Sequence, residues 1–297
     1  MSDSKFRGVA LFGFIDRFKT DEDCMRYLSS IKWVNGYKCK ICGNENYCKG
    51  RKPFSHRCTK CKYDESPTAH TMFDKCKFPL LTAFHIIFKI STKKKGMSTL
   101  ELHKEFELRQ ETCWTFKNKL QEAMKSSHVY PLTGEVHVDE FFIGGPEKNK
   151  RGRGAEKQKL VVVAIEKVTG GIGRAYGQVI ENASSKALAC FFDSYIETSA
   201  MVITDQWNGY KPLKKDYPSI MHIPSKNGKN FPDMHIHIMN LKGWLRGIHH
   251  HCSKEHLQGY LDEFHFRHNR RNNMNTIFHK LIERMINSSK KPIESDY

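Results

Sequence analysis

The stretch GEVHVDEFFIGG, residues 134–145, decides the fold of the region around it. Its apolar and polar residues alternate with the period of a β-strand, which carries Asp139 and Glu140 towards its end. A second apolar run, Met201 to Ile203, places Asp205 at its own end. One strand-end aspartate is more often an ordinary residue, but two suit Mg²⁺, which takes few protein carboxylates. The alternation points Glu140 away from Asp139, which leaves Glu140 at most a supporting role.

The elements around these aspartates predict the topology. Strands are expected at 134–143, 159–168 and 172–180, followed by a helix over 184–196 and a fourth strand at 201–206. This order, with aspartates on the first and fourth strands, is that of a ribonuclease-H-like fold. The first and fourth strands are neighbours in that fold, so Asp139 and Asp205 are expected to face one ion pair. A third ligand then comes from a later helix.

A zinc ribbon is predicted near the N-terminus. Cys39, Cys42, Cys58 and Cys61 form C-x2-C-x15-C-x2-C, a spacing that lets two tight turns supply four thiolates to one Zn²⁺. Gly43 follows the first pair, where the turn needs a permissive backbone. Cys48 and His56 are rival ligands with poorer spacing, and the other five cysteines are expected to be ordinary thiols.

Three helices are expected between the ribbon and the first strand, at 80–90, 98–106 and 110–124. A short connection at 107–109 makes the last two a helix-turn-helix candidate, whose second helix would enter a DNA groove. Arg109, Lys117 and Lys119 are then candidate phosphate contacts. A small bundle that only packs on its neighbours explains the pattern equally well.

Composition favours a globular protein with a polyanionic partner. The 297 residues are 39% hydrophobic, and 49 Lys and Arg against 32 Asp and Glu give a formal charge of +17. Such an excess points to nucleic acid, although a basic surface can also serve solubility. The N-terminus does not resemble a signal peptide and no stretch is long enough to span a bilayer, so a soluble, intracellular protein without membrane contact is expected.

Several segments together resemble the insertion-sequence transposases of the ISXO-like group, which are related to the eukaryotic Merlin elements. The resemblance covers nearly the whole chain: the ribbon, KKGMSTLELHKEF, VHVDEFFIGG, RGRGAEKQKLVVVAIE, ITDQWNGY and NLKGWLRGIHHHCSKEHLQGYLDEFHFRHNRR at 240–271. It implies a DNA transposase that binds terminal inverted repeats and target DNA. Its implied metals are catalytic Mg²⁺ or Mn²⁺ and structural Zn²⁺, and action on two DNA ends suggests a homodimer or larger synaptic complex.

The resemblance also implies site residues. The family holds its catalytic metals with an Asp, Asp, Asn or Asp, Asp, Glu set, which corresponds here to Asp139, Asp205 and Asn240. Glu263 is the rival third ligand, although an ion pair with Arg267 four residues later explains it more simply. Lys242 and Arg246 are candidates to hold the scissile phosphate. Further candidate DNA contacts come from two basic clusters: Arg151, Arg153, Lys157, Arg267, Arg270 and Arg271.

The expected architecture is α/β (α+β) with an N-terminal helix and zinc ribbon at 1–70, a helical DNA-binding unit at 71–130, a ribonuclease-H-like catalytic domain at 131–285 and a tail at 286–297. The expected enzyme is DNA-associated, at the nucleoid of a bacterium or in a eukaryotic nucleus. HIHIMNLK lacks the serine that commonly precedes the asparagine, which keeps open a decayed or domesticated copy that binds DNA without cutting it. A nuclease or resolvase without strand transfer is a second alternative. A zinc-ribbon transcription factor is the alternative that the sequence favours least, because it would leave residues 134–271 without a function.

Overall fold

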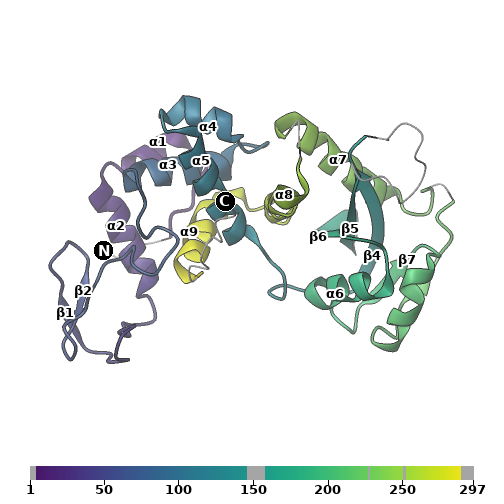
Figure 1. The fold of residues 1–297 in the computed structure, drawn as a ribbon, viewed down its shortest axis with the longest axis horizontal. Helices are drawn as coiled ribbons and strands as arrows, with labels where there is room; N and C mark the ends of the chain where they lie inside the picture. The colour runs from purple at the N-terminus through teal and green to yellow at the C-terminus, as the bar shows by residue number, and fades with distance from the viewer. Residues whose placement is uncertain (1–4, 146–157, 227, 250–251, 289–297) are drawn as a thin grey trace. The chain divides into compact units, whose positions relative to one another are not determined.

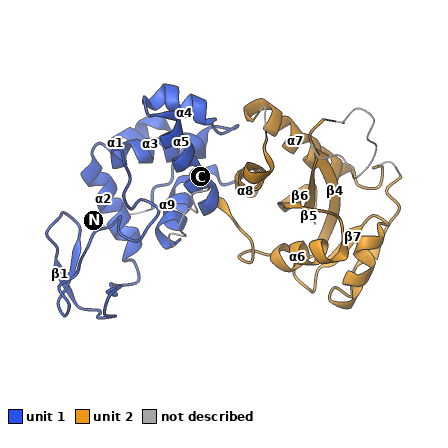
Figure 2. Ribbon diagram, in the orientation of Figure 1, with its two compact units in different colours: residues 1–123, 272–297 blue, residues 124–271 orange. Residues whose placement is uncertain are grey.

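The computed structural model describes residues 5–145, 158–226, 228–249 and 252–288. The chain divides into two compact units (Figure 2): residues 1–123 with 272–297, and residues 124–271. Among the described residues, no helix combines the length and the apolar character needed to cross a membrane.

The first unit is mainly helical (Figure 1). Its elements are α1 (Leu11–Arg17), α2 (Asp21–Lys32), α3 (Leu80–Thr92), α4 (Thr99–Phe106), α5 (Gln110–Met124), η2 (Met274–Thr276), α9 (Ile277–Asn287) and a small antiparallel sheet of β1 (Tyr47–Lys49), β2 (His56–Cys58) and β3 (Asp64–Glu65). Capping boxes start two of the helices: Thr20 with Asp23 begins α2, and Ser98 with Glu101 begins α4. The helices expected between the ribbon and the first strand are thus present.

The core of this unit joins the two ends of the chain. Phe278 of α9 lies with its ring centroid 5.4 Å from Phe14 and 5.6 Å from Phe84. The buried hydroxyl of Tyr27 bonds His279 Nδ1 at 2.7 Å. The compact units therefore divide the chain differently from the expected boundaries: α9 begins inside the range 131–285 and ends in the expected tail, but it packs with α2 and α3, because its apolar stripe fills their core.

The second unit contains a five-stranded sheet in the order β6-β5-β4-β7-β8. Its strands are β4 (Glu135–Ile143), β5 (Lys159–Val168), β6 (Gly171–Ile180), β7 (Met201–Thr204) and β8 (Met221–His222). The first three pair antiparallel, while β7 runs parallel to both β4 and β8. The predicted neighbours, the first and fourth strands of the unit, do lie side by side, and the expected mixed α/β class is confirmed.

Helices cover both faces of this sheet (Figure 1). Helix α6 (Ser185–Tyr195) packs one face through Leu188, Phe191 and Phe192 against Val136 and Val138. Helices α7 (Pro232–Ile248) and α8 (Lys254–His268) pack the opposite face, where Leu241 and Leu261 share a core with Phe141. The even-numbered positions of β4 thus face α6 and its odd-numbered positions face α7, as strand alternation requires.

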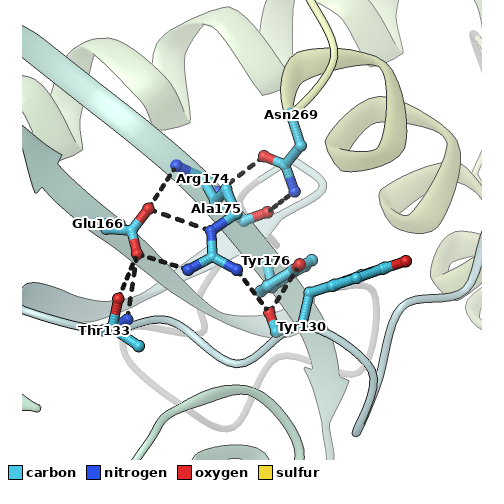
Figure 3. A network of polar contacts seen from close by, with 7 residues as sticks. All are labelled: Tyr130, Thr133, Glu166, Arg174, Ala175, Tyr176 and Asn269. Atoms are coloured by element: carbon cyan, nitrogen blue, oxygen red, sulfur yellow. Dashed lines mark hydrogen bonds and ion pairs between the residues drawn. The ribbon is translucent and has the colours of Figure 1, made fainter. Parts of the chain in front are cut away.

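Side chains of α8 and of the residue after it occupy the outer edge of β6. Gln258 accepts from the Val179 N–H at 2.9 Å and donates to the Gly177 carbonyl at 3.2 Å. Asn269 does the same at Ala175, at 2.8 and 3.0 Å (Figure 3). These amides take the place of a sixth strand for the backbone groups of an edge strand.

A partly exposed polar network ties β5 and β6 to the segment before β4 (Figure 3). Glu166 accepts from Arg174 Nη2 at 2.7 Å and from the N–H of Thr133 at 3.1 Å, while the hydroxyl of Tyr176 donates to the Tyr130 carbonyl at 3.0 Å. Arg174 also bonds that carbonyl, at 3.3 Å. The network ties the segment that leads into β4, and so helps to fix the strand that carries Asp139.

Candidate functional site

The four predicted zinc ligands converge. The sulfur atoms of Cys39, Cys42, Cys58 and Cys61 all lie within 4.8 Å of one another. Each C-x2-C turn is closed by a backbone bond to the first cysteine carbonyl, from Gly43 at 2.9 Å and from Lys62 at 3.1 Å. Both donors have a left-handed backbone, with φ of 70° and 62°. The predicted need for a permissive residue at Gly43 is met, whereas the second turn places a lysine in the same conformation.

The thiolate is the form that binds Zn²⁺, and the surroundings favour it at Cys39 and Cys58, whereas burial and the neighbouring cysteines raise the pKa of Cys61 to about 12. Burial raises the pKa of Cys58, but the N–H groups of Cys61 and Lys60 and the amide of Asn44 outweigh it and bring the pKa down to about 6. The rival ligands lie elsewhere. Cys48 is exposed, and His56 is stacked between Trp33 and Tyr47, with ring centroids 3.8 and 3.7 Å away. The four cysteines fit a tetrahedral structural zinc, which Cys48 and His56 do not join.

Asp139 and Asp205 are brought together by the parallel pairing of β4 with β7. Val138 pairs with Thr204, so the next residue on each strand is an aspartate. Alternation places both on the face covered by α7, since Phe141 and Ile203 of the same strands belong to the core on that face. The expectation that these two aspartates face one site is supported by this register.

The two carboxylates interact electrostatically. Burial raises the pKa of Asp139 to about 6; the Glu140 N–H, 2.8 Å from Asp139 Oδ1, opposes the rise, and the negative charge of Asp205 adds to it. Asp205 is held by the N–H of Trp207, which donates to its Oδ1 at 2.9 Å. At neutral pH, a bound divalent cation offsets the repulsion between two adjacent carboxylates more effectively than a single proton does.

Glu140 points to the other face, as alternation predicts. Tyr210, which is fully buried in the core on the α6 side, donates to Glu140 Oε2 at 2.5 Å. Burial, the adjacent Glu140 and the two aspartates raise the pKa of Tyr210, which keeps it a neutral donor. Glu140 therefore ties β4 to the core on the α6 side through Tyr210.

Helix α7 crosses the face of the sheet that carries the aspartates. The ring of Phe231, just before the helix, lies 5.5 Å from that of His137, and Lys242 Nζ lies 5.1 Å from the Phe141 ring centre. The middle of α7 thus lies over Asp139. Its sheet-facing positions are Met234, Ile238, Leu241 and Leu245, whereas Asn240 is exposed and about 130° away from their mean direction at 100° per residue.

The remaining α7 and α8 candidates have distinct surroundings. Lys242 is half-buried, and burial together with Arg246 lowers its pKa. Glu263 is fully buried on α8, and burial lowers the pKa of Arg267, a shift that the charge of Glu263 opposes. The two charges, four residues apart, thus interact electrostatically, and their direct ion pair stays a prediction. The choice of Asn240 or Glu263 as third ligand stays a prediction.

Two protein-family models match the parts of the chain that carry these features. Residues 131–269 match the ISXO2-like transposase domain, and residues 19–64 match the transposase zinc-ribbon domain. The chain carries an ISXO2-like transposase domain and a transposase zinc ribbon. The match to the transposase domain spans both aspartates and the helices α7 and α8. No curated protein matches the chain.

The basic residues predicted to bind DNA are in varied places on the transposase. Arg109 is exposed. Lys117 is 2% exposed and its Nζ donates to the Met97 carbonyl at 2.7 Å, while Lys119 donates to the Met72 carbonyl at 3.2 Å. Both lysines thus bind the protein's own backbone, and their contact with DNA stays a prediction.

The second basic cluster is also engaged within its unit. The Arg270 guanidinium lies 3.8 Å from the centre of the Phe266 ring, and Arg271 donates to the carbonyls of Gly173 and Ile172 at the edge of β6. Arg267 is buried beside Glu263. Arg151, Arg153 and Lys157 lie outside the described residues.

Sequence reasoning passed over two aromatic residues of the transposase that adjoin the aspartates, Trp207 and Tyr210. Both stand in ITDQWNGY, the segment that carries Asp205. Their positions two and five residues after Asp205 could have marked them as neighbours of the site. A single sequence does not say, however, that one ring is buried and the other exposed. The structure makes that distinction: Tyr210 is fully buried and Trp207 is 36% exposed.

Proposed function

We propose that this transposase binds the terminal inverted repeats of its own element and catalyses metal-dependent cleavage and strand transfer. The observation that carries the proposal is the pair Asp139 and Asp205, adjacent in register on parallel strands and close enough for one charge to raise the pKa of the other carboxyl. Oxygen ligands of this kind fit Mg²⁺ or Mn²⁺.

Each group has a stated part in the proposal. Asp139 and Asp205 hold the cations, with Asn240 or Glu263 completing the set, and Lys242 and Arg246 bind the scissile phosphate. Bound cations supply polarisation of the phosphate and a lower pKa for the attacking water or 3′-hydroxyl. The bond between Tyr210 and Glu140 keeps in place the part of β4 that carries Asp139.

The zinc ribbon and the α4–α5 pair are proposed to recognise the terminal repeats, mainly through phosphate contacts that weaken with salt. Because an element has two ends, the active form is proposed to be a homodimer or larger synaptic complex on DNA. Light scattering of the protein with and without end DNA measures this directly.

The experiment is Mg²⁺-dependent cleavage and joining by the purified full chain, on DNA ends taken from the repeats that flank its gene. Wild type is expected to give joined products, and Asp139→Ala or Asp205→Ala to abolish them while leaving end binding intact. Asp193→Ala, which removes an exposed carboxylate of α6, is the matched control. Comparison of Asn240→Ala with Glu263→Gln identifies the third ligand as the one whose loss abolishes both steps.

Two outcomes would count against the proposal. Specific end binding without products from the wild type would make the chain a DNA reader that no longer cuts. Cleaved but never joined ends would make it a nuclease or resolvase.

A further inference from the structure

A pocket of about 360 Å³ lies in the first unit, where the end of α2 and the zinc ribbon meet the end of α9. Its lining includes Trp33, Lys38, Lys40, Glu65, His70 and Ile286. The four zinc cysteines are not among its lining residues, so the pocket is separate from the metal site. Its volume is at the lower end of the range for small-molecule sites, roughly 300–1,000 Å³. It therefore suits one small ligand rather than a nucleic-acid helix.

Glu65 brings a buried carboxylate to this pocket. Its side chain is 1% exposed, and its Oε1 lies 2.7 Å from Lys32 Nζ. Among the described residues, Oε2 has no hydrogen-bond partner. A buried acceptor without a donor is costly, and buried polar groups are nearly always paired. Oε2 is thus the atom of the pocket that most needs an N–H donor from a ligand.

Lys32 does not supply that donor. Its ammonium group has three protons, and Nζ also donates to the carbonyls of Ser66 at 2.9 Å and Ala69 at 2.7 Å. Together with Glu65 Oε1, these contacts account for all three protons. Lys32 therefore holds Glu65 and the turn at 66–69 in place but leaves Oε2 open.

Lys38 and Lys40 make the lining positive. Both are exposed, and neither forms an ion pair within the described part of the chain. Burial lowers the pKa of Lys32, Glu65 opposes this, and the charge of Lys40 adds to it. Three lysines and one glutamate line the pocket, which gives a formal charge of +2 with His70 neutral. Since this excess repels a cationic ligand, the pocket favours one with a neutral N–H donor and an anionic group.

A nucleotide has both of these features. Adenine, cytosine and guanine each carry an exocyclic amino group, and the carboxylate of Glu or Asp accepts from such a group when it reads cytosine N4. Thymine presents the acceptor O4 instead. Lysine binds phosphate as a point charge. The buried acceptor and the two exposed lysines therefore match the base and the phosphate of a single nucleotide.

We infer that this pocket binds one nucleotide that has an amino-bearing base. The base donates to Glu65 Oε2, and the phosphate lies against Lys38 and Lys40. The nucleotide is either free in solution or unpaired within DNA, and the chemistry that recognises it is the same for both. The inference goes beyond the proposed function, because it does not depend on cleavage at the aspartate pair.

The test is calorimetric titration of the zinc-loaded full chain with dAMP, dCMP, dGMP and dTMP. The wild type is expected to bind the three amino-bearing nucleotides roughly 10-fold or more tightly than dTMP, the effect of one hydrogen bond to a charged group. Titration with inorganic phosphate separates a nucleotide site from a simple anion site. Phosphate that binds as tightly as dCMP would contradict a role for the base.

Substitutions separate the base contact from the phosphate contact. Glu65→Gln keeps the shape of the side chain, but Lys32 then holds the amide oxygen and an NH₂ group faces the ligand, so the preference over dTMP should disappear. Lys38→Gln with Lys40→Gln leaves the Lys32–Glu65 pair intact. This double variant should weaken binding of all four nucleotides about 2- to 10-fold and keep the preference.

Lys49→Gln with Lys60→Gln is the matched control for the double variant, because both are exposed ribbon lysines outside the pocket. It should change neither affinity nor preference. Since Glu65→Gln leaves the buried Lys32 without a counter-ion, zinc content and urea unfolding are measured alongside. If that variant does not fold, the comparison with dTMP and the two double variants still decide.

Competition with end-repeat DNA identifies the source of the nucleotide. A duplex with one unpaired cytidine that displaces dCMP, when the fully paired duplex does not, makes the pocket a site for an extrahelical nucleotide. Bound dCMP that neither duplex displaces makes it a site for free nucleotides.

Three results would overturn the inference: no binding of any nucleotide at millimolar concentrations, equal affinity for dTMP and the amino-bearing nucleotides, or equal losses in the two double lysine variants. Its failure is distinguishable from that of the proposed function. A protein that cleaves and joins DNA but binds no nucleotide refutes the inference alone. A protein that binds nucleotides as expected but never cleaves refutes the function alone.

Discussion

At the scale of the residue, the ionised Asp139 carboxylate is destabilised in the fold, mainly by burial, and a bound metal ion would offset that cost. Its folded pKa of about 6 lies above the ordinary value of 3.8, so ionisation of this carboxyl costs the metal-free fold stability as pH rises from about 4 to 6. The cost above pH 6 is about 3 kcal/mol at most. Asp139→Asn, whose oxygen can still accept from the Glu140 N–H, should raise the urea midpoint of the metal-free protein at pH 7.5 and leave it little changed at pH 4.

The same pKa sets the pH dependence of metal binding. A protonated Asp139 must release its proton to bind a cation, so Mn²⁺ affinity should fall as pH drops below about 6 and level off above it. Calorimetric titration between pH 5 and 8 measures this. Asp193→Ala serves as the control, and an Mn²⁺ affinity that is flat across this range would contradict the assignment of Asp139 as a ligand.

Single residues also show how far sequence reasoning reaches. The shared face of Asp139 and Asp205 follows from alternation, but the expected strand-end position is wrong for Asp139, which is the fifth of the nine residues of β4, whereas Asp205 directly follows the last residue of β7. Lys117 is a different case: it was predicted to meet phosphate, but it lies four residues after Cys113 and three before Leu120, within the buried stripe of α5. Its burial was therefore available from the helical period, whereas its bond to the Met97 carbonyl depends on a loop that the sequence does not position.

At the scale of the element, α8 and the edge of β6 depend on two amide side chains. Asn269→Ala would leave the N–H and carbonyl of buried Ala175 without partners, which should cost about 1–3 kcal/mol of unfolding free energy. Denaturant unfolding followed by circular dichroism measures the loss. Asn272→Ala, at an exposed asparagine three residues later, is the control. Equal stabilities for the two variants would show that water replaces the amide.

Elements with strong periodicity were predictable, and short or distant ones were not. The long strands β4, β5 and β6 and the helix α6 follow from their sequence patterns. Strand β8 has only two residues, and its place is set by pairing with β7 and by the Thr204 hydroxyl, 2.9 Å from His222 Nδ1. Helix α9 shows the other limit: its apolar stripe indicates burial, but a single sequence does not name α2 and α3 as its partners.

At the scale of the whole molecule, zinc should stabilise one unit without being required by the other. Each unit has its own core, and all four zinc ligands lie in the first. Cys58→Ser should remove the bound zinc, measured by native mass spectrometry, and open residues 33–66 to proteolysis. Mn²⁺ binding at the aspartate pair should persist. Cys48→Ser is the matched control, and loss of zinc in that variant would place Cys48 among the ligands.

The packing of α9 against the N-terminal helices α2 and α3 has a consequence for folding during translation. Residues 124–271 leave the ribosome as a continuous stretch with a complete core and can fold at once, since domains generally fold as units while the chain is made. The N-terminal helices emerge earlier but lack Phe278 and its neighbours until the last part of the chain appears. The nascent protein therefore completes the unit that carries the aspartates before the unit that carries the zinc ribbon, although the ribbon is translated first.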